Sequence, residues 1–188
     1  MLKVLVIGDI HIPERAHMIP KPIMDKIEAE QFDLVLCTGD LTGEWTMKLL
    51  SHFGKLYIVR GNMDFLALPK SARIEAEAFT IGLIHGDTVY PRGNIKELAR
   101  EAQRMNVDML VYGHTHRLSI NKVRTESREV LLLDPGSATG CWSGGLASFT
   151  PSFIMLEIVR NEAIVHSYEL KGEVLGESII KFRVCRYS

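Results

Sequence analysis

Two histidines with one residue between them, His114 and His116, follow an apolar stretch in the segment GHTH. An aspartate and a histidine at the same spacing, Asp9 and His11, follow the N-terminal apolar stretch in the segment GDIH. In an extended chain, side chains two residues apart lie on one face, so the two members of each pair can converge on one site. Carboxylate and imidazole groups both bind divalent transition metals, and each pair is therefore a candidate part of a metal site.

Further polar residues occupy equivalent positions, each next to a glycine at the end of an apolar run. The carboxylate of Asp40 can bridge two cations, Asn62 offers a neutral amide oxygen, and His85 adds an imidazole. The combined set contains oxygen and nitrogen donors but no thiolate. It predicts a site for two divalent metal ions, which together can bind a phosphate ester and activate a water molecule. The predicted ligands are Asp9, His11, Asp40, Asn62, His85, His114 and His116.

The apolar runs that precede these residues predict the elements that must position them. Continuous runs of Val, Ile and Leu are typical of strands buried on both faces. Strands alternating with helices favour a layered α/β domain, in which ligands bind at the carboxyl ends of the strands. The runs cover residues 4–7, 34–37, 56–59, 81–84, 109–112 and 130–133, and apolar residues at helical spacing predict helices over 20–31, 43–53 and 93–105.

The last part of the chain has a different pattern. Residues 152–159, 162–170 and 178–185 show partial alternation of apolar and polar side chains, with short turns between them. Such segments are typical of neighbouring antiparallel strands. Since no linker, repeat or low-complexity tract divides the sequence, we expect residues 1–188 to form a single domain.

Composition narrows the classes of function. Hydrophobic residues make up 46% of the chain and the formal net charge is -1, which indicates a globular protein and argues against a nucleic-acid ligand. The apolar runs are far shorter than the roughly 20 residues of a membrane span, and the N-terminal run is interpreted as a strand, not a signal peptide. The cysteines, Cys37, Cys141 and Cys185, have no metal-binding spacing and predict reduced, mostly buried thiols in the cytoplasm.

In this order, the motifs resemble those of the calcineurin-like metallophosphoesterases. They are GDIH at 8–11, GD at 39–40, GNMD at 61–64, HG at 85–86 and GHTH at 113–116. The resemblance covers residues 1–140. The length and the strand pattern of the tail resemble the small single-domain phosphodiesterase branch of that family, which also contains the scaffold subunit of the retromer coat.

The resemblance implies a four-layer α/β/β/α sandwich of two mixed sheets flanked by helices. It implies hydrolysis of a small phosphate ester by two divalent ions, with manganese the first choice and iron, nickel and zinc as alternatives. Carried over by motif, one ion binds Asp9, His11 and His116, the other binds Asn62, His85 and His114, and Asp40 bridges them.

One position departs from the family pattern. The family places a histidine that assists departure of the leaving group after its metal-binding asparagine, and Met63 stands there in this chain. Methionine cannot donate a proton, which predicts modest activity, best with good leaving groups such as aryl phosphates. Asp64 is a candidate for proton transfer or for orienting the ligands, with a turn cap as the alternative. The predicted catalytic residues are Asp40, Asn62, His85 and Asp64.

Two alternatives stay open from the sequence. Arg60 and Arg92 are candidates for contact with a substrate phosphate, or are surface residues in salt bridges. The apolar segments 18–20 and 141–151 are candidate surfaces for a protein partner or a second copy of the chain. The resemblance also allows a catalytically weak or inactive protein-interaction scaffold of the same fold, but all the predicted ligand positions hold competent donors, which favours an enzyme.

Overall fold

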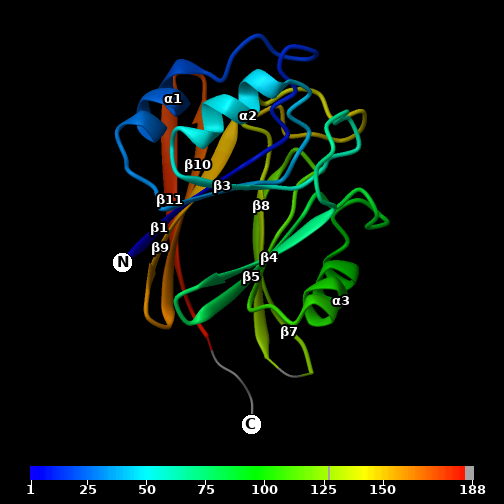
Figure 1. Ribbon diagram of the computed structural model, residues 1–188, viewed down its shortest axis with the longest axis vertical. Helices are drawn as coiled ribbons and strands as arrows, with labels where there is room; N and C mark the ends of the chain where they lie inside the picture. The colour runs from blue at the N-terminus through cyan, green and yellow to red at the C-terminus, as the bar shows by residue number, and fades with distance from the viewer. Residues whose placement is uncertain (127, 185–188) are drawn as a thin grey trace.

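The computed structural model describes residues 1–126 and 128–184, which form two mixed sheets packed face to face (Figure 1). One sheet has six strands in the order β11-β10-β9-β1-β2-β3, and the other has five in the order β4-β5-β6-β8-β7. The first contains β1 (Leu2–Ile7), β2 (Leu34–Cys37), β3 (Lys55–Ile58), β9 (Ser152–Val159), β10 (Glu162–Lys171) and β11 (Val174–Arg183). The second contains β4 (Ser71–Ala76), β5 (Phe79–Ile84), β6 (Met109–Val111), β7 (Leu118–Arg124) and β8 (Glu129–Pro135). The helices are α1 (Lys21–Glu28), α2 (Glu44–Ser51) and α3 (Ile95–Met105).

The alternation of side chains along each buried strand explains the layers. In β1, Val4 and Val6 face the core between the sheets, whereas Leu5 and Ile7 face the layer under α1 and α2. Neighbouring residues of a strand point to opposite faces of the sheet. Because both faces of these strands are buried, residues on both faces are apolar, which produces the continuous apolar runs. The third core cluster, which includes Leu98, lies between α3 and the other sheet. The four-layer sandwich is thereby confirmed (Figure 1).

The predicted antiparallel tail is also confirmed. It extends the first sheet beyond β1, where β9 pairs antiparallel with β1 through Leu5 and Met155, and β10 and β11 follow in the same manner. The strand predicted over 178–185 corresponds to β11, which begins at Val174, and residue 185 lies outside the described part of the chain.

Two strands were missing from the prediction, β4 and β7. Both are edge strands of the five-stranded sheet and have no continuous apolar run. In β4 only Ile74 and Ala76 are buried, while Ser71, Arg73 and Glu75 are exposed. An edge strand covered on one face needs few apolar residues, so its sequence resembles a loop.

Two further predictions concern membranes and thiols. No helix in residues 1–126 and 128–184 combines the length and the hydrophobicity needed to cross a membrane. Cys37 and Cys141 are buried free thiols, as expected. Cys185 lies outside the described residues.

Candidate metal centre

The predicted ligands meet where strands of both sheets end. Asp9 and His11 follow β1, Asp40 follows β2 and Asn62 follows β3, all from the six-stranded sheet. From the five-stranded sheet, His85 follows β5, and His114 and His116 follow β6. The loops are joined by backbone hydrogen bonds, such as that from the N–H of His11 to the carbonyl of Asp40 at 2.9 Å. Across the sheets, the N–H of His114 donates to Asp9 Oδ2 at 2.9 Å.

Several of the predicted ligand residues have a strained backbone. Non-glycine residues rarely adopt a left-handed conformation, and those that do concentrate at functional sites. This conformation turns the chain immediately after each strand, so both side chains of a GDIH or GHTH segment can point inward. The φ angles are 48° for Asp9, 49° for His11, 52° for Asp40, 70° for His114 and 53° for His116.

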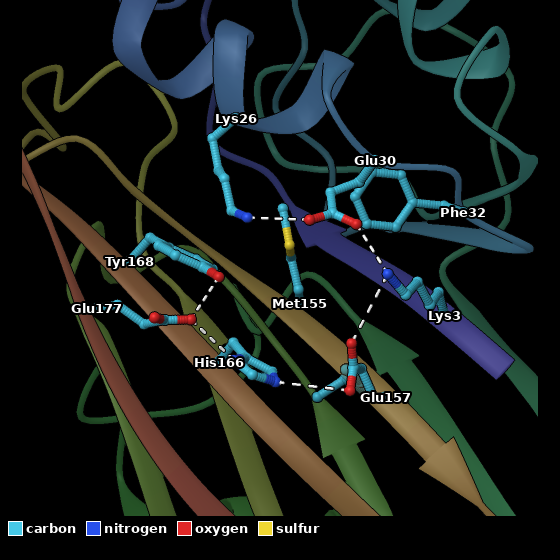
Figure 2. A pocket seen from close by; sticks show the side chains of 10 residues that line it. Lys3, Lys26, Glu30, Phe32, Met155, Glu157, His166, Tyr168 and Glu177 are labelled. Carbon is cyan, nitrogen blue, oxygen red and sulfur yellow. Dashed lines mark hydrogen bonds and ion pairs between the residues drawn. The ribbon is translucent and has the colours of Figure 1, made fainter. Parts of the chain in front are cut away.

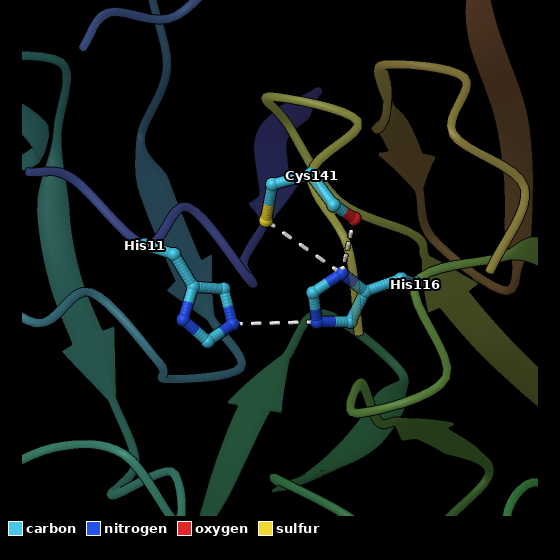
Figure 3. A group of neighbouring side chains, drawn as sticks. All are labelled: His11, His116 and Cys141. Atoms are coloured by element: carbon cyan, nitrogen blue, oxygen red, sulfur yellow. Dashed lines mark hydrogen bonds between the residues drawn. The ribbon is translucent and has the colours of Figure 1, made fainter. Parts of the chain in front are cut away.

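One group of donors surrounds His11 and His116 (Figure 3). Their Nε2 atoms are 3.3 Å apart. Asp9 Oδ1 lies 3.4 Å from His116 Nε2, and Asp40 Oδ2 lies 3.4 Å from His11 Nε2. Two donors bound tetrahedrally to one ion at about 2.1 Å are about 3.4 Å apart. The spacing of these side chains therefore fits ligands of a common cation.

A second group surrounds His85. Its Nε2 lies 3.0 Å from Asn62 Oδ1 and 3.5 Å from Asp40 Oδ2. The rings of His85 and His114 meet edge to face with centroids 5.0 Å apart. Asp40, His85 and His114 offer ligand atoms within 4.8 Å of one another. The same oxygen, Asp40 Oδ2, thus faces both groups, which is one of the ways in which a carboxylate can bridge two cations.

Backbone carbonyls orient the imidazoles. His85 Nδ1 lies 2.8 Å from the carbonyl oxygen of Thr38, and His116 Nδ1 lies 2.9 Å from that of Cys141. An imidazole that donates from Nδ1 is held with Nε2 directed at the centre, the orientation that a metal ligand needs. Sequence reasoning missed Thr38 and Cys141 because a carbonyl acceptor depends on position and not on side-chain type. The Cys141 thiol also lies 3.7 Å from His116 Nδ1 (Figure 3).

Burial makes it unfavourable for the side chains of the centre to carry a charge. Asp9 and His11 are fully buried and Asp40 is 2% exposed. Burial raises the pKa of Asp40 to about 6 and lowers the pKa of His11 to about 4. Asp9 Oδ1 is buried and has no hydrogen-bond partner among the described residues. Buried carboxylates are costly unless a positive charge compensates them, so the donor set fits divalent cations.

The opposite side of the centre is open. Asn62 is exposed and His114 is half-buried, whereas the remaining ligands are buried. Burial lowers the pKa of His114 to about 4, which leaves this imidazole neutral and able to bind a metal at physiological pH. A substrate can therefore reach the centre from the side of Asn62 and His114.

Asp64 lies behind the centre and is 7% exposed. Its Oδ2 accepts the N–H groups of Asp40 at 2.8 Å and Gly61 at 2.9 Å. Its Oδ1 accepts those of Leu41 at 2.9 Å and Thr42 at 3.1 Å. These bonds tie the loop after β2 to the loop after β3, and they favour the turn-cap interpretation of Asp64.

The other candidate residues have clear contacts. Arg92 donates to the carbonyl of Ser143 at 3.2 Å and so supports the segment 141–151, whereas Arg60 is exposed beside the centre. In that segment Trp142, Leu146 and Phe149 are exposed, as expected.

The prediction for residues 18–20 was correct for one apolar side chain and wrong for the other. Met18 is 70% exposed, but Ile19 is only 5% exposed. Ile19 is buried because it packs into the core layer under α1 and α2.

A separate cavity of about 120 Å³ lies between α1 and the strands β1, β9, β10 and β11 (Figure 2). Ion pairs surround it: Lys3 contacts Glu30 at 2.8 Å and Glu157 at 3.7 Å, and His166 contacts Glu177 at 2.8 Å. Lys3 lies six residues before Asp9, which is about 20 Å along an extended chain. This cavity is therefore remote from the metal centre.

Comparison with known proteins gave consistent matches. The sequence profile of the calcineurin-like phosphoesterase superfamily domain matches residues 2–161. A probable metallophosphoesterase of Methanocaldococcus jannaschii is 41% identical over 134 residues, which are 71% of this chain and 67% of that protein.

Solved structures of Vps29 are also similar to this chain. A single mutant of Vps29 from Entamoeba histolytica has a TM-score of 0.90 at 35% identity, and the match covers 97% of this chain and 100% of that one. Wild-type Vps29 of the same organism, complexed with zinc, has a TM-score of 0.87 at 34% identity and covers 96% and 99%. Vps29 of Cryptosporidium parvum has a TM-score of 0.91 at 28% identity and covers 97% and 98%.

Proposed function

Because this chain belongs to the calcineurin-like phosphoesterase superfamily, we propose that it is a metal-dependent phosphodiesterase that hydrolyses a small phosphate ester. The family implies divalent metal ions, and the donor groups described above can hold them. The observation that carries the proposal is the position of Asp40 Oδ2, which faces His11 at 3.4 Å and His85 at 3.5 Å. A carboxylate shared between two groups of donors suits a centre of two neighbouring ions.

The proposed ligand assignment follows the two groups. Two divalent ions would act as Lewis acids that stabilise charge on the phosphoryl oxygens, and they would lower the pKa of a water molecule, so that hydroxide is present as the nucleophile at neutral pH. Manganese is the proposed metal, and zinc is the alternative best supported, because Vps29 of Entamoeba histolytica was solved with zinc. One ion would be held by Asp9, His11 and His116, the other by Asn62, His85 and His114, and both by Asp40.

The protein's own residues would prepare the site for reaction. His85 and His116 are held in one orientation by the carbonyls of Thr38 and Cys141, so little reorganisation is needed when a substrate binds. The buried ligands on one side exclude water, and the exposed Asn62 marks the side for substrate entry. Asp40, Asn62 and His85 are therefore the proposed catalytic ligands.

Departure of the leaving group would proceed without an acidic side chain from position 63. Met63 donates only its backbone N–H, to Asp40 Oδ1 at 2.8 Å. Asp64 accepts four backbone N–H groups, and we assign it a positioning role in preference to proton transfer. The proposed substrates are consequently esters with good leaving groups, whose departure needs no proton.

The second candidate function is a protein-interaction scaffold in the cytoplasm. It is supported by the similarity to Vps29 and by the exposed apolar side chains of Trp142, Leu146 and Phe149. The complete set of donors at the centre favours the enzyme, because a scaffold has no need for seven convergent donors, five of them in strained backbone conformations.

Hydrolysis of bis(p-nitrophenyl) phosphate tests the proposal. The purified protein is treated with a chelator, dialysed and supplied with manganese, iron, nickel or zinc. Turnover is expected only with added metal, and it should be abolished by Asp40→Ala and by His116→Ala. The control is Asp25→Ala, which removes an exposed carboxylate from α1. Undiminished turnover in both ligand variants would refute the assignment, and a lack of turnover with every metal would favour the scaffold.

A further inference from the structure

A cleft of about 280 Å³ opens beside the metal centre. Its lining includes Asn62 and His85, which are proposed metal ligands on the open side of the centre. The same cleft is lined by the cationic side chains of Arg60, Lys70 and Arg104. A molecule bound at the centre can therefore extend into a space that contains positive charge.

Two of these cations are placed by the strands that also deliver metal ligands. Arg60 immediately precedes Gly61 and Asn62, and its backbone N–H donates to the carbonyl of Pro69 at 2.7 Å, which brings Lys70 next to it. In the pairing of β4 with β5, Ser71 lies opposite Ile84. Because the strands are antiparallel, Lys70, which precedes Ser71, lies beside His85, which follows Ile84. Lys70 is therefore next to a proposed ligand.

The charges of the cleft are only partly compensated. Arg104 is paired with Glu101, with Nε 2.9 Å from Oε2. Asp87, at the wall of the cleft, is exposed. Neither Arg60 nor Lys70 forms an ion pair within residues 1–126 and 128–184. Apart from the Arg104–Glu101 pair, the charged residues that line the cleft are the cations Arg60 and Lys70 and the carboxylate Asp87.

We propose that Arg60 and Lys70 bind a second phosphate group of the substrate. This inference rests on the proposed function, because the first phosphate is the one held at the metal centre. A guanidinium fork and a neighbouring ammonium group suit a phosphate with several acceptor oxygens. A volume of about 280 Å³ lies just below the range of drug-sized ligand sites, about 300–1,000 Å³, and suits a phosphate on a sugar-sized linker. The substrate class is therefore a small molecule with two phosphate groups, one hydrolysed and one retained.

Binding provides a test that needs no turnover. The affinity of the manganese-loaded protein for thymidine 3′,5′-bisphosphate and for thymidine 5′-monophosphate is measured by calorimetry. A charge-assisted contact with the second phosphate should make the bisphosphate bind about tenfold to a hundredfold more tightly. The double variant Arg60→Gln, Lys70→Gln should reduce this ratio to about one. Because both side chains are exposed, the variant is expected to fold, which thermal unfolding checks.

Two controls separate a specific site from a general charge effect. Lys55→Gln also removes an exposed cation, but at the opposite end of β3 from Arg60, and it should retain the preference. The exchanged pair Arg60→Lys, Lys70→Arg keeps both charges and should retain most of it. Equal binding of the two nucleotides by the unmodified protein would overturn the inference, as would a preference that survives in the double variant.

Kinetics separate this inference from the proposed function. Thymidine 5′-(p-nitrophenyl phosphate) and its 3′-phosphorylated form have the same scissile bond and leaving group. The 3′-phosphorylated form should have the higher kcat/KM, and the double variant should lose that advantage. If neither ester is hydrolysed while the bisphosphate still binds preferentially, the hydrolase is refuted but the anion site stands. If both are hydrolysed equally, the second-phosphate site is refuted but the hydrolase stands.

Discussion

Asp64→Asn changes one atom and tests whether the centre depends on a buried carboxylate that binds no metal. In the native protein each oxygen of Asp64 accepts two backbone N–H groups, at 2.8 and 2.9 Å for Oδ2 and at 2.9 and 3.1 Å for Oδ1. An asparagine has only one acceptor oxygen. Its amide group would face two N–H donors, either those of Asp40 and Gly61 or those of Leu41 and Thr42.

The magnitude follows from the bonds lost. A hydrogen bond to a charged group contributes about 1.5–3 kcal/mol, so the loss of two costs about 3–6 kcal/mol. Asp64 is 7% exposed, and water can replace little of this. The cost is a large part of the total stability of a domain, about 5–15 kcal/mol. The loops also contain Asp40 and Thr42 at φ of 52° and 62°, conformations that persist only if the surroundings hold them.

Urea denaturation of the chelator-treated protein measures the free energy of unfolding without a contribution from bound metal. Asp25→Asn is the matched control, since it removes an exposed carboxylate from a pair with Lys21 on α1 and should cost less than about 0.5 kcal/mol. A loss below about 1 kcal/mol for Asp64→Asn would refute the reasoning. Manganese affinity distinguishes the roles of Asp64, because a positioning residue affects metal binding, whereas a proton donor affects only the rate.

Four other outcomes are expected. Gly61→Ala should abolish metal-dependent hydrolysis, because the new Cβ would lie 2.5 Å from the backbone nitrogen of Asp40, while Gly145→Ala, where the nearest atom is 3.7 Å away, should leave the rate unchanged. Manganese at 100 times its dissociation constant for the unmodified protein should raise the free energy of unfolding of that protein by about 2.7 kcal/mol. At the same manganese concentration, His116→Ala should show a smaller increase in the urea titration. Met63→His should accelerate hydrolysis of alkyl esters more than of p-nitrophenyl esters, and equal effects on both would contradict a missing proton donor. His166→Ala should leave kcat/KM unchanged within about twofold, because His166 lines the separate cavity under α1 and not the cleft beside the centre.

The position of the centre explains why its predicted ligands come from both sheets of the fold. The ends of β1, β2 and β3 from one sheet meet those of β5 and β6 from the other. Asp40 contributes one oxygen to contacts with His11 of its own sheet and His85 of the facing sheet. The packing of the sheets therefore sets the separation of the two donor groups, and the core between the sheets is part of the metal centre's support.

The sequence alone determined the layered fold and the identity of the predicted donors. Strands buried on both faces must be apolar throughout, so their ends are visible as the points where Asp, Asn, His and Gly begin. Side-chain donors for a metal are restricted to a few residue types, and this restriction marks Asp9 and His116 as candidate donors before any contact is known. The edge strands β4 and β7 escaped recognition because exposure on one side relaxes that requirement.

Only the tertiary structure decided how those side chains meet and what supports them. It placed the carbonyls of Thr38 and Cys141 behind two imidazoles, and it turned Asp64 from a candidate acid into an acceptor of four backbone N–H groups. It also placed Arg60 and Lys70 together in a cleft beside His85. Backbone hydrogen bonds and charge pairing depend on distances between segments far apart in the chain. Every residue carries the same backbone donor and acceptor, so its type does not reveal which of them will meet.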